Sequence, residues 1–253
     1  MSKLINRLRH TRTRRRWRRA ADDAEHADLA DLRQQRNEAR RLSVELDRLI
    51  HVADGRLALP KLGSSSFPRP HGTDWAWRPA LWCGPLHRPG LSSAPSEAAL
   101  GTEVRVFHDC SASELTLRQL RNTRVQDLAP FGLRMDVFRF DGSFLSLAID
   151  LPGAAAERLH RDHILRVETI LEVESPLGIY ARLNIQNGPN TEQISRKLAA
   201  QDSAARVDFD LAGTRLNERR IEKIWLDLIF ETPEMNQVIL RDLTFARHRR
   251  AAL

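Results

Sequence analysis

Lysine is scarce in this sequence, although the chain is basic. The 253 residues include 40 lysines and arginines, and the only lysines are Lys3, Lys61, Lys197 and Lys223. Arginine therefore supplies nearly all of the positive charge, and its planar guanidinium suits bidentate binding to phosphate and carboxylate groups. A GC-rich codon bias would give the same enrichment without functional meaning, so the enrichment alone assigns no partner.

Cysteine and long apolar runs are also scarce. Cys83 and Cys110 are too few to define a disulfide framework, and neither lies in a metal-ligand spacing. No apolar stretch approaches the ~18 residues that a membrane helix needs. The basic start is followed by Ala20-Ala21-Asp22-Asp23 instead of the apolar region of a secretory signal. We therefore expect a soluble, cytoplasmic protein with no transmembrane segment.

Common catalytic motifs are absent as well. The sequence has no Gly-x-Ser-x-Gly, Walker loop, His-Glu-x-x-His or dinucleotide fingerprint, which argues against the corresponding enzyme classes. His108-Asp109-Cys110 suggests a nucleophile, but neighbouring strand residues point to opposite faces, so Asp109 could not orient His108. A short polar turn explains His160 and His163 better than a metal site does. We expect no cofactor and no metal, and enzymatic activity stays open but unsupported.

The positive charge is concentrated at the N-terminus. Residues 1–54 carry 14 basic and 9 acidic residues, whereas residues 55–253 carry 26 and 24. Residues 1–20 hold nine lysines and arginines and no acidic residue, and such dense like charge predicts disorder or a frayed helix in isolation. The candidate residues for an anionic partner are Arg12, Arg14, Arg15, Arg16, Trp17, Arg18 and Arg19.

Three interpretations of this basic arm remain open. It could bind the phosphates of a nucleic acid through counterion release, with Trp17 stacking on a base. It could instead be a solubilising tail, or an anchor for an acidic protein surface. Nucleic acid is the less favoured partner, because no base-reading fold follows the arm.

An apolar stripe follows the basic residues. Its members recur at spacings of three, four and seven: Leu32, Ala39, Leu42, Leu46, Leu49 and Ala53. This period predicts one helix over about 22–53, with Asp22 and Asp23 as caps and Gly55 as its end. The stripe is short for a coiled coil. Packing on a protein partner and packing on the chain's own domain both remain open.

Composition divides the chain into three parts. The predicted organisation is a basic arm and helix at 1–55, a Pro/Gly/Ser linker at 56–73 and a β domain at 74–253. The β domain starts with an irregular, proline-rich segment at 74–91, which excludes a helix or central strand. This segment contains Trp75, Trp77 and Trp82. Packing against a core explains these rings better than a stacking platform for sugars or bases does.

From residue 101 the apolar period changes to two. About nine short runs alternate in this way over residues 101–248, and Asp141-Gly142 between two of them predicts a hairpin. The fold class that we predict is mainly β: an antiparallel, jelly-roll-like β-sandwich preceded by an Arg-rich N-terminal α-helix. The residues expected to point inward include Leu145, Leu147, Ile149, Val167, Leu171, Leu183, Phe209 and Leu228.

Two resemblances extend this prediction. The run Trp225-Leu-Asp-Leu-Ile-Phe-Glu-Thr-Pro-Glu-Met-Asn-Gln-Val-Ile-Leu-Arg-Asp-Leu-Thr-Phe resembles the final hairpin of galactose-binding and carbohydrate-binding-module jelly rolls. That resemblance covers about residues 101–248 and implies a fold more than a function, because sandwiches support many activities. The whole chain is similar to a bacterial domain-of-unknown-function family with the same Arg-rich start and β-rich end.

One predicted strand carries the best candidate for a ligand site. Tyr180, Arg182, Asn184 and Gln186 alternate with apolar residues, so all four project from one face. An aromatic ring beside a bidentate donor and two amides suits the apolar face and the hydroxyls of a sugar. An ordinary solvated sheet face is the competing interpretation.

These observations lead to three hypotheses for the function. The first is a non-enzymatic binding protein whose sandwich binds a glycan or a protein surface, and whose helix attaches it to a partner. The second is an adaptor that binds nucleic acid or another anionic surface through the arm. The third is a glycan-active lyase or hydrolase on a sandwich fold.

Overall fold

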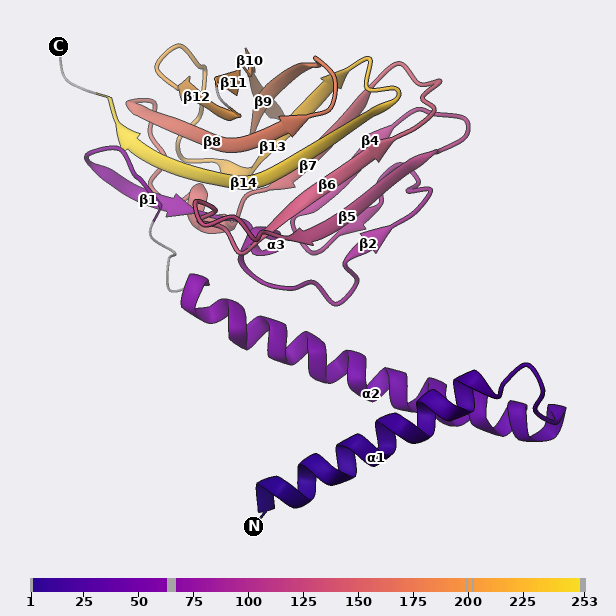
Figure 1. Cartoon of the computed structure of the whole chain (residues 1–253). Helices are drawn as coiled ribbons and strands as arrows, with labels where there is room; N and C mark the ends of the chain where they lie inside the picture. The colour runs from indigo at the N-terminus through magenta and orange to yellow at the C-terminus, as the bar shows by residue number, and fades with distance from the viewer. Residues whose placement is uncertain (1, 63–66, 199, 202, 251–253) are drawn as a thin grey trace. The chain divides into compact units, whose positions relative to one another are not determined.

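The computed structural model describes residues 2–62, 67–198, 200–201 and 203–250. The chain divides into a helical unit, residues 1–54, and a β unit, residues 55–253 (Figure 1). Among the described residues no helix is long and apolar enough to cross a membrane.

The helical unit contains two helices where one was predicted. Helix α1 spans Ser2–Asp22, and helix α2 spans Leu29–Leu62. The prediction of one helix starting at Asp22 is therefore wrong. The side chain of Asp28 accepts a hydrogen bond of 2.9 Å from the backbone N–H of Ala30, so Asp28 is the residue that caps the second helix.

Gly55 does not end α2, which continues to Leu62. One glycine costs a helix only about 1 kcal/mol, which a helix of 34 residues tolerates. Within the helical unit Arg16 of α1 forms an ion pair of 3.0 Å with Glu38 of α2. The apolar stripe on α2 stays accessible, with Leu46 47% and Leu49 64% exposed.

The β unit is an antiparallel sandwich of two sheets, which confirms the predicted fold class. Sheet A runs β11-β12-β8-β14-β6-β5-β2, with β1 paired to β14. Its strands are β1 (Thr73–Trp77), β2 (Gly90–Leu91), β5 (Leu115–Arg121), β6 (Phe131–Val137), β8 (His163–Val173), β11 (Ala200–Gln201), β12 (Ala204–Asp210) and β14 (Asn236–Arg249). Sheet B runs β10-β9-β13-β7-β4-β3. Its strands are β3 (Ala99–Leu100), β4 (Val104–His108), β7 (Leu145–Asp150), β9 (Gly178–Asn187), β10 (Asn190–Lys197) and β13 (Ile221–Glu231).

The chain repeatedly crosses from one sheet to the other. The hairpin predicted at Asp141-Gly142 is wrong, because β6 lies in sheet A and β7 in sheet B. The loop between them is held by the loop that follows β4. Asp109 accepts a hydrogen bond of 2.7 Å from the N–H of Ser143, and Asp141 accepts one of 3.1 Å from the N–H of Ser111. The carboxylates thus fix a crossover.

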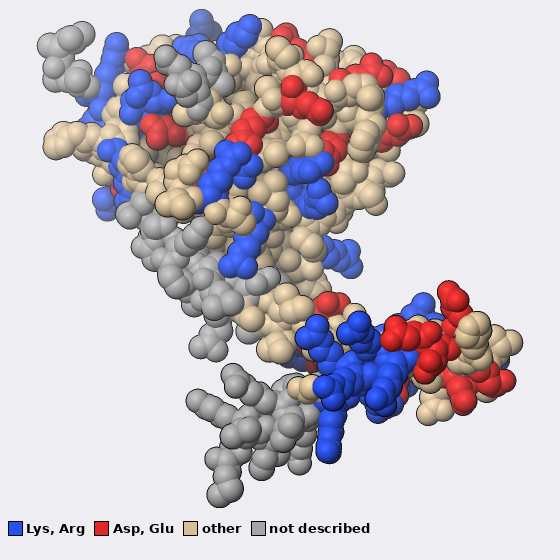
Figure 2. All heavy atoms as spheres, in the orientation of Figure 1, with Lys and Arg blue, Asp and Glu red and all other residues tan. Residues whose placement is uncertain are grey.

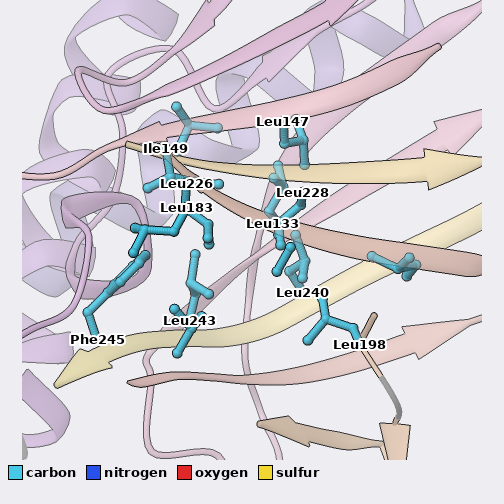
Figure 3. Packing of buried hydrophobic residues seen from close by; sticks show 14 of the residues in the cluster. Leu133, Leu147, Ile149, Leu183, Leu198, Leu226, Leu228, Leu240, Leu243 and Phe245 are labelled. Atoms are coloured by element: carbon cyan, nitrogen blue, oxygen red, sulfur yellow. The ribbon is translucent and has the colours of Figure 1, made fainter. Parts of the chain in front are cut away.

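The core lies between the two sheets (Figure 3). All eight residues predicted to point inward are buried. In Figure 3 Leu147, Ile149, Leu226 and Leu228 lie on one side of this core, with Leu243 and Phe245 of β14 across from them. Period-two alternation thus identified the buried face correctly, because a sheet with one covered face buries every second residue.

The segment before the sandwich is pinned to sheet A, as its tryptophans indicated. The prediction that its prolines exclude a helix is wrong, because a short helix begins directly after Pro79. Trp82, in the short helix α3 (Ala80–Cys83), is fully buried and donates a hydrogen bond of 3.0 Å to the carbonyl of Leu240. Trp75 and Trp77 lie in β1, with ring centroids 6.4 Å apart, and are partly buried against the core. Packing against the core, not a free stacking platform, is confirmed for this cluster. A 3-10 turn at Gly153–Ala155 completes the elements.

Candidate functional site

The outer side of sheet B carries the four residues predicted as a ligand site. Their apolar neighbours on β9 are buried, so Tyr180, Arg182, Asn184 and Gln186 face away from the core. Tyr180, the only tyrosine of the chain, is partly exposed, as are Arg182 and Gln186. Asn184 is fully buried and does not reach solvent.

Asn184 lies beneath a hydrogen-bond network that joins three strands. Its amide donates a hydrogen bond of 2.9 Å to Oδ2 of Asp227 on β13. Its side-chain carbonyl oxygen accepts a hydrogen bond of 3.0 Å from the amide of Gln193 on β10. The guanidinium of Arg182 also donates two hydrogen bonds to Oδ2 of Asp227, of 2.9 Å from Nη2 and 3.1 Å from Nε. Asp227 is therefore a buried, paired carboxylate.

Two aromatic rings on this side each have a lysine beside them. Trp225 of β13 is half-buried and lies opposite Asn184 in the strand register. The ammonium group of Lys223 lies 5.4 Å from its ring centroid, and that of Lys197 on β10 lies 5.9 Å from the centroid of Tyr180. These distances are within the range of a cation–π attraction.

A second ion-pair group adjoins the first. Asp150, at the end of β7, pairs with Lys223 at 2.8 Å and with Arg105 of β4 at 3.1 Å. We call the whole surface the polar face. It comprises Gln193, Lys197, Tyr180, Arg182, Asn184, Gln186, Lys223, Trp225, Asp227, Asp150 and Arg105.

Analysis of the sequence found only the β9 part of this face. It placed Leu228 of β13 inward, and the structure buries Leu226 and Leu228, so Trp225 and Asp227 face out. It also missed β10, whose alternation is weak because both sides of this edge strand are largely accessible. The register between β9 and β13, some 45 residues apart at Arg182 and Asp227, has no local sequence signal.

Two hollows of the described surface lie elsewhere. The larger, about 600 Å³, is lined by β8, β12 and β14 together with Phe67, Pro68 and Leu128. The smaller, about 410 Å³, lies among Arg161, Asp162, Ala212, Glu218 and Arg250. No residue of the polar face lines either of these two hollows.

The predicted anion-binding residues lie along α1. Arg12, Arg14, Arg15, Arg16, Arg18 and Arg19 are exposed, and Trp17 is partly buried. Figure 2 shows Lys and Arg atoms gathered along the helical arm, with Asp and Glu atoms grouped near the turn that joins its helices. Arg16 is bonded to Glu38, and its guanidinium lies 5.5 Å from the ring of Trp17.

The sequence features that suggested catalysis have structural roles. The Nε2 atom of buried His108 donates a hydrogen bond of 2.9 Å to the carbonyl of Ala94, and its Nδ1 atom accepts a hydrogen bond from the N–H of Cys110. Burial raises the pKa of the Cys110 thiol, so it is not an activated thiolate. The Nδ1 atom of His163 accepts a hydrogen bond from the backbone N–H of His160. Over the described ranges no group of three or more His, Cys, Asp or Glu residues could hold a metal ion.

Comparison with solved structures gives loose similarities. The C-terminal family 22 carbohydrate-binding module of Clostridium thermocellum Xyn10B matches with 8% identity, covering 74% of this chain and 99% of that one, at a TM-score of 0.39. A second match is a family 11 carbohydrate-binding module from Clostridium thermocellum, in complex with a β-1,3-1,4-mixed-linked tetrasaccharide. It is 9% identical, covers 62% of this chain and 94% of that one, and has a TM-score of 0.35.

A larger protein also appears in this comparison. The enzymatically active domain of tailspike protein 4 of bacteriophage CBA120 matches with 4% identity over 57% of this chain and 19% of that one, at a TM-score of 0.41. The chain therefore corresponds to about a fifth of that domain's length. None of these overlays is close enough to transfer a ligand or an activity.

The sequence places the chain in a protein family. No curated protein matches it. One family model does, over residues 1–253, so its match includes the basic arm, the helices and the sandwich together. The chain belongs to the family of unknown function DUF6478.

Proposed function

We propose that the protein is a non-enzymatic glycan-binding protein and that the polar face is its binding surface. The observation that carries the proposal is the pairing of two accessible rings, Tyr180 and Trp225, with side chains that are already fixed by hydrogen bonds. Rings supply an apolar platform for a sugar, and groups held in place lose little conformational entropy on binding.

The dimensions of the face favour an oligosaccharide. Trp225 lies opposite Asn184, four residues along β9 from Tyr180. Four strand residues correspond to roughly 13 Å. A single sugar ring cannot contact both aromatic side chains across that distance, whereas a short chain of sugars can.

The charges of the face support binding over hydrolysis. A glycosidase needs two carboxyl groups, one of them able to donate a proton. Asp227 is bonded to Arg182, and Asp150 is bonded to both Lys223 and Arg105. Both carboxylates are therefore engaged in ion pairs, and neither is free to approach a glycosidic bond in the arrangement that the structure shows.

The test is glycan-array binding of the full chain, followed by calorimetry with the best oligosaccharide. Tyr180→Ala and Trp225→Ala should each weaken binding roughly tenfold, as expected when truncating a ring costs about 1.4 kcal/mol. Phe144→Ala is the matched control, because Phe144 is 44% exposed but lies in the loop before β7. Equal binding by all three variants would contradict the proposal.

A second candidate function concerns the arm. The exposed arginines of α1 favour an anionic partner, and binding through them should weaken steeply with salt because it releases counterions. The test combines a salt titration with replacement of Arg14, Arg15, Arg18 and Arg19 by Gln. Anion binding that survives these replacements would exclude the arm as its source.

A further inference from the structure

We propose that the polar face selects anionic oligosaccharides, in which the sugars carry carboxylate or sulfate groups, over neutral ones. This inference rests on the proposed function and narrows it to one chemical class of glycan. It follows from how the charged groups of the face are layered.

The cations of the face lie outermost and the carboxylates lie beneath them. The side chains of Arg182, Lys223 and Arg105 are 36%, 45% and 42% exposed. Those of their partners, Asp227 and Asp150, are only 9% and 23% exposed. A ligand that approaches the face therefore meets guanidinium and ammonium groups first.

The face also has more cations than carboxylates. Lys197, on the edge strand β10, is exposed and brings the cations to four, against the two carboxylates of the face. Glu231 is a further exposed acid at the end of β13, opposite Gly178 and beyond the rows of the face. Each of the two aromatic rings thus has a cation beside it.

The position of the two lysines discriminates between ligands. Each lies within 6 Å of a ring centroid, so a neutral sugar that stacks on the ring must displace an ammonium group and lose its attraction to the ring. An anionic sugar can place its ring against the aromatic side chain while its charged group pairs with the lysine. Asp150 and Asp227 hold Lys223 and Arg182 in place for such contacts.

The experiment compares matched oligosaccharides with the full chain. The probes are oligogalacturonate and its carboxyl-reduced counterpart, and a sulfated galactan oligosaccharide and its desulfated counterpart. We expect at least one anionic member to bind about tenfold or more tightly than its neutral match, because each charge-assisted hydrogen bond supplies that factor. Equal or tighter binding of both neutral members overturns this inference and leaves the proposed function standing. Binding of none overturns both.

Variants separate the face from the basic arm, which attracts polyanions by itself. Lys197→Gln and Lys223→Gln together should remove most of the anionic preference; Asp150 keeps Arg105 as its partner in this variant. The control is Arg196→Gln, which removes one charge from the same strand at a position paired with buried Ala181. The inference is wrong if the preference persists without the two lysines, or if replacing Arg14, Arg15, Arg18 and Arg19 by Gln abolishes it.

Discussion

Removal of Arg182 tests the network beneath the polar face. In Arg182→Ala the carboxylate of Asp227 loses two hydrogen bonds and keeps the one that the amide of Asn184 donates. An unsatisfied buried polar group costs about 1–3 kcal/mol, more when it is charged. Because Arg182 is 36% exposed, water can partly replace it, so we expect a loss of about 1–2 kcal/mol.

Urea denaturation of the full chain, followed by fluorescence, measures this loss as a lower midpoint with an unchanged slope. The double variant Arg182→Ala/Asp227→Ala should regain part of it, because no carboxylate is then left unpaired. Removal of an exposed side chain without such a partner changes stability by about 0.5 kcal/mol or less. A change that small in Arg182→Ala would show that the pairing with Asp227 does not stabilise the protein.

Three further outcomes follow from the structure. Trp82→Ala should lower the free energy of unfolding by about 3–5 kcal/mol, measured by denaturation, and a loss under 1 kcal/mol would contradict its burial. The hydrogen bond from Arg241 lowers the pKa of Glu172 below its ordinary 4.5, so the pair stabilises the fold above that pH and stops doing so as the pH falls. Glu172→Gln should therefore reduce the acid-induced loss of stability, and an unchanged pH profile would refute this. Leu42→Asp with Leu46→Asp should lower the molar mass in light scattering if the α2 stripe joins copies of the chain; an unchanged mass would exclude that role.

The β domain could be predicted largely from local patterns. Alternation on β9 placed Tyr180 and Arg182 on one face, because the side-chain period of a strand is two whatever its neighbours are. It could not reveal that Asn184 is buried, since Gln193 of β10 covers it only after the β9–β10 hairpin forms. It could not pair Arg182 with Asp227 either, because sheet order decides that contact.

The errors came from signals that have more than one structural meaning. Asp141-Gly142 is typical of a hairpin, but here Asp141 binds the loop after β4 and the chain changes sheets. Asp22 is a plausible cap by its residue type, but α1 ends there and Asp28 caps α2. Gly55 is a frequent helix end, yet α2 passes through it.

The central claim is that the polar face binds the glycan, and its tryptophan offers the most direct measurement. The chain has five tryptophans, so the full protein labelled with ¹⁵N-tryptophan gives five indole N–H signals, which Trp→Phe variants assign. We would titrate it with the oligosaccharide selected on the array. The account predicts that the Trp225 signal shifts while those of Trp75, Trp77 and Trp82 stay in place. A shift of Trp17 or of the sheet A tryptophans with Trp225 unmoved would contradict it.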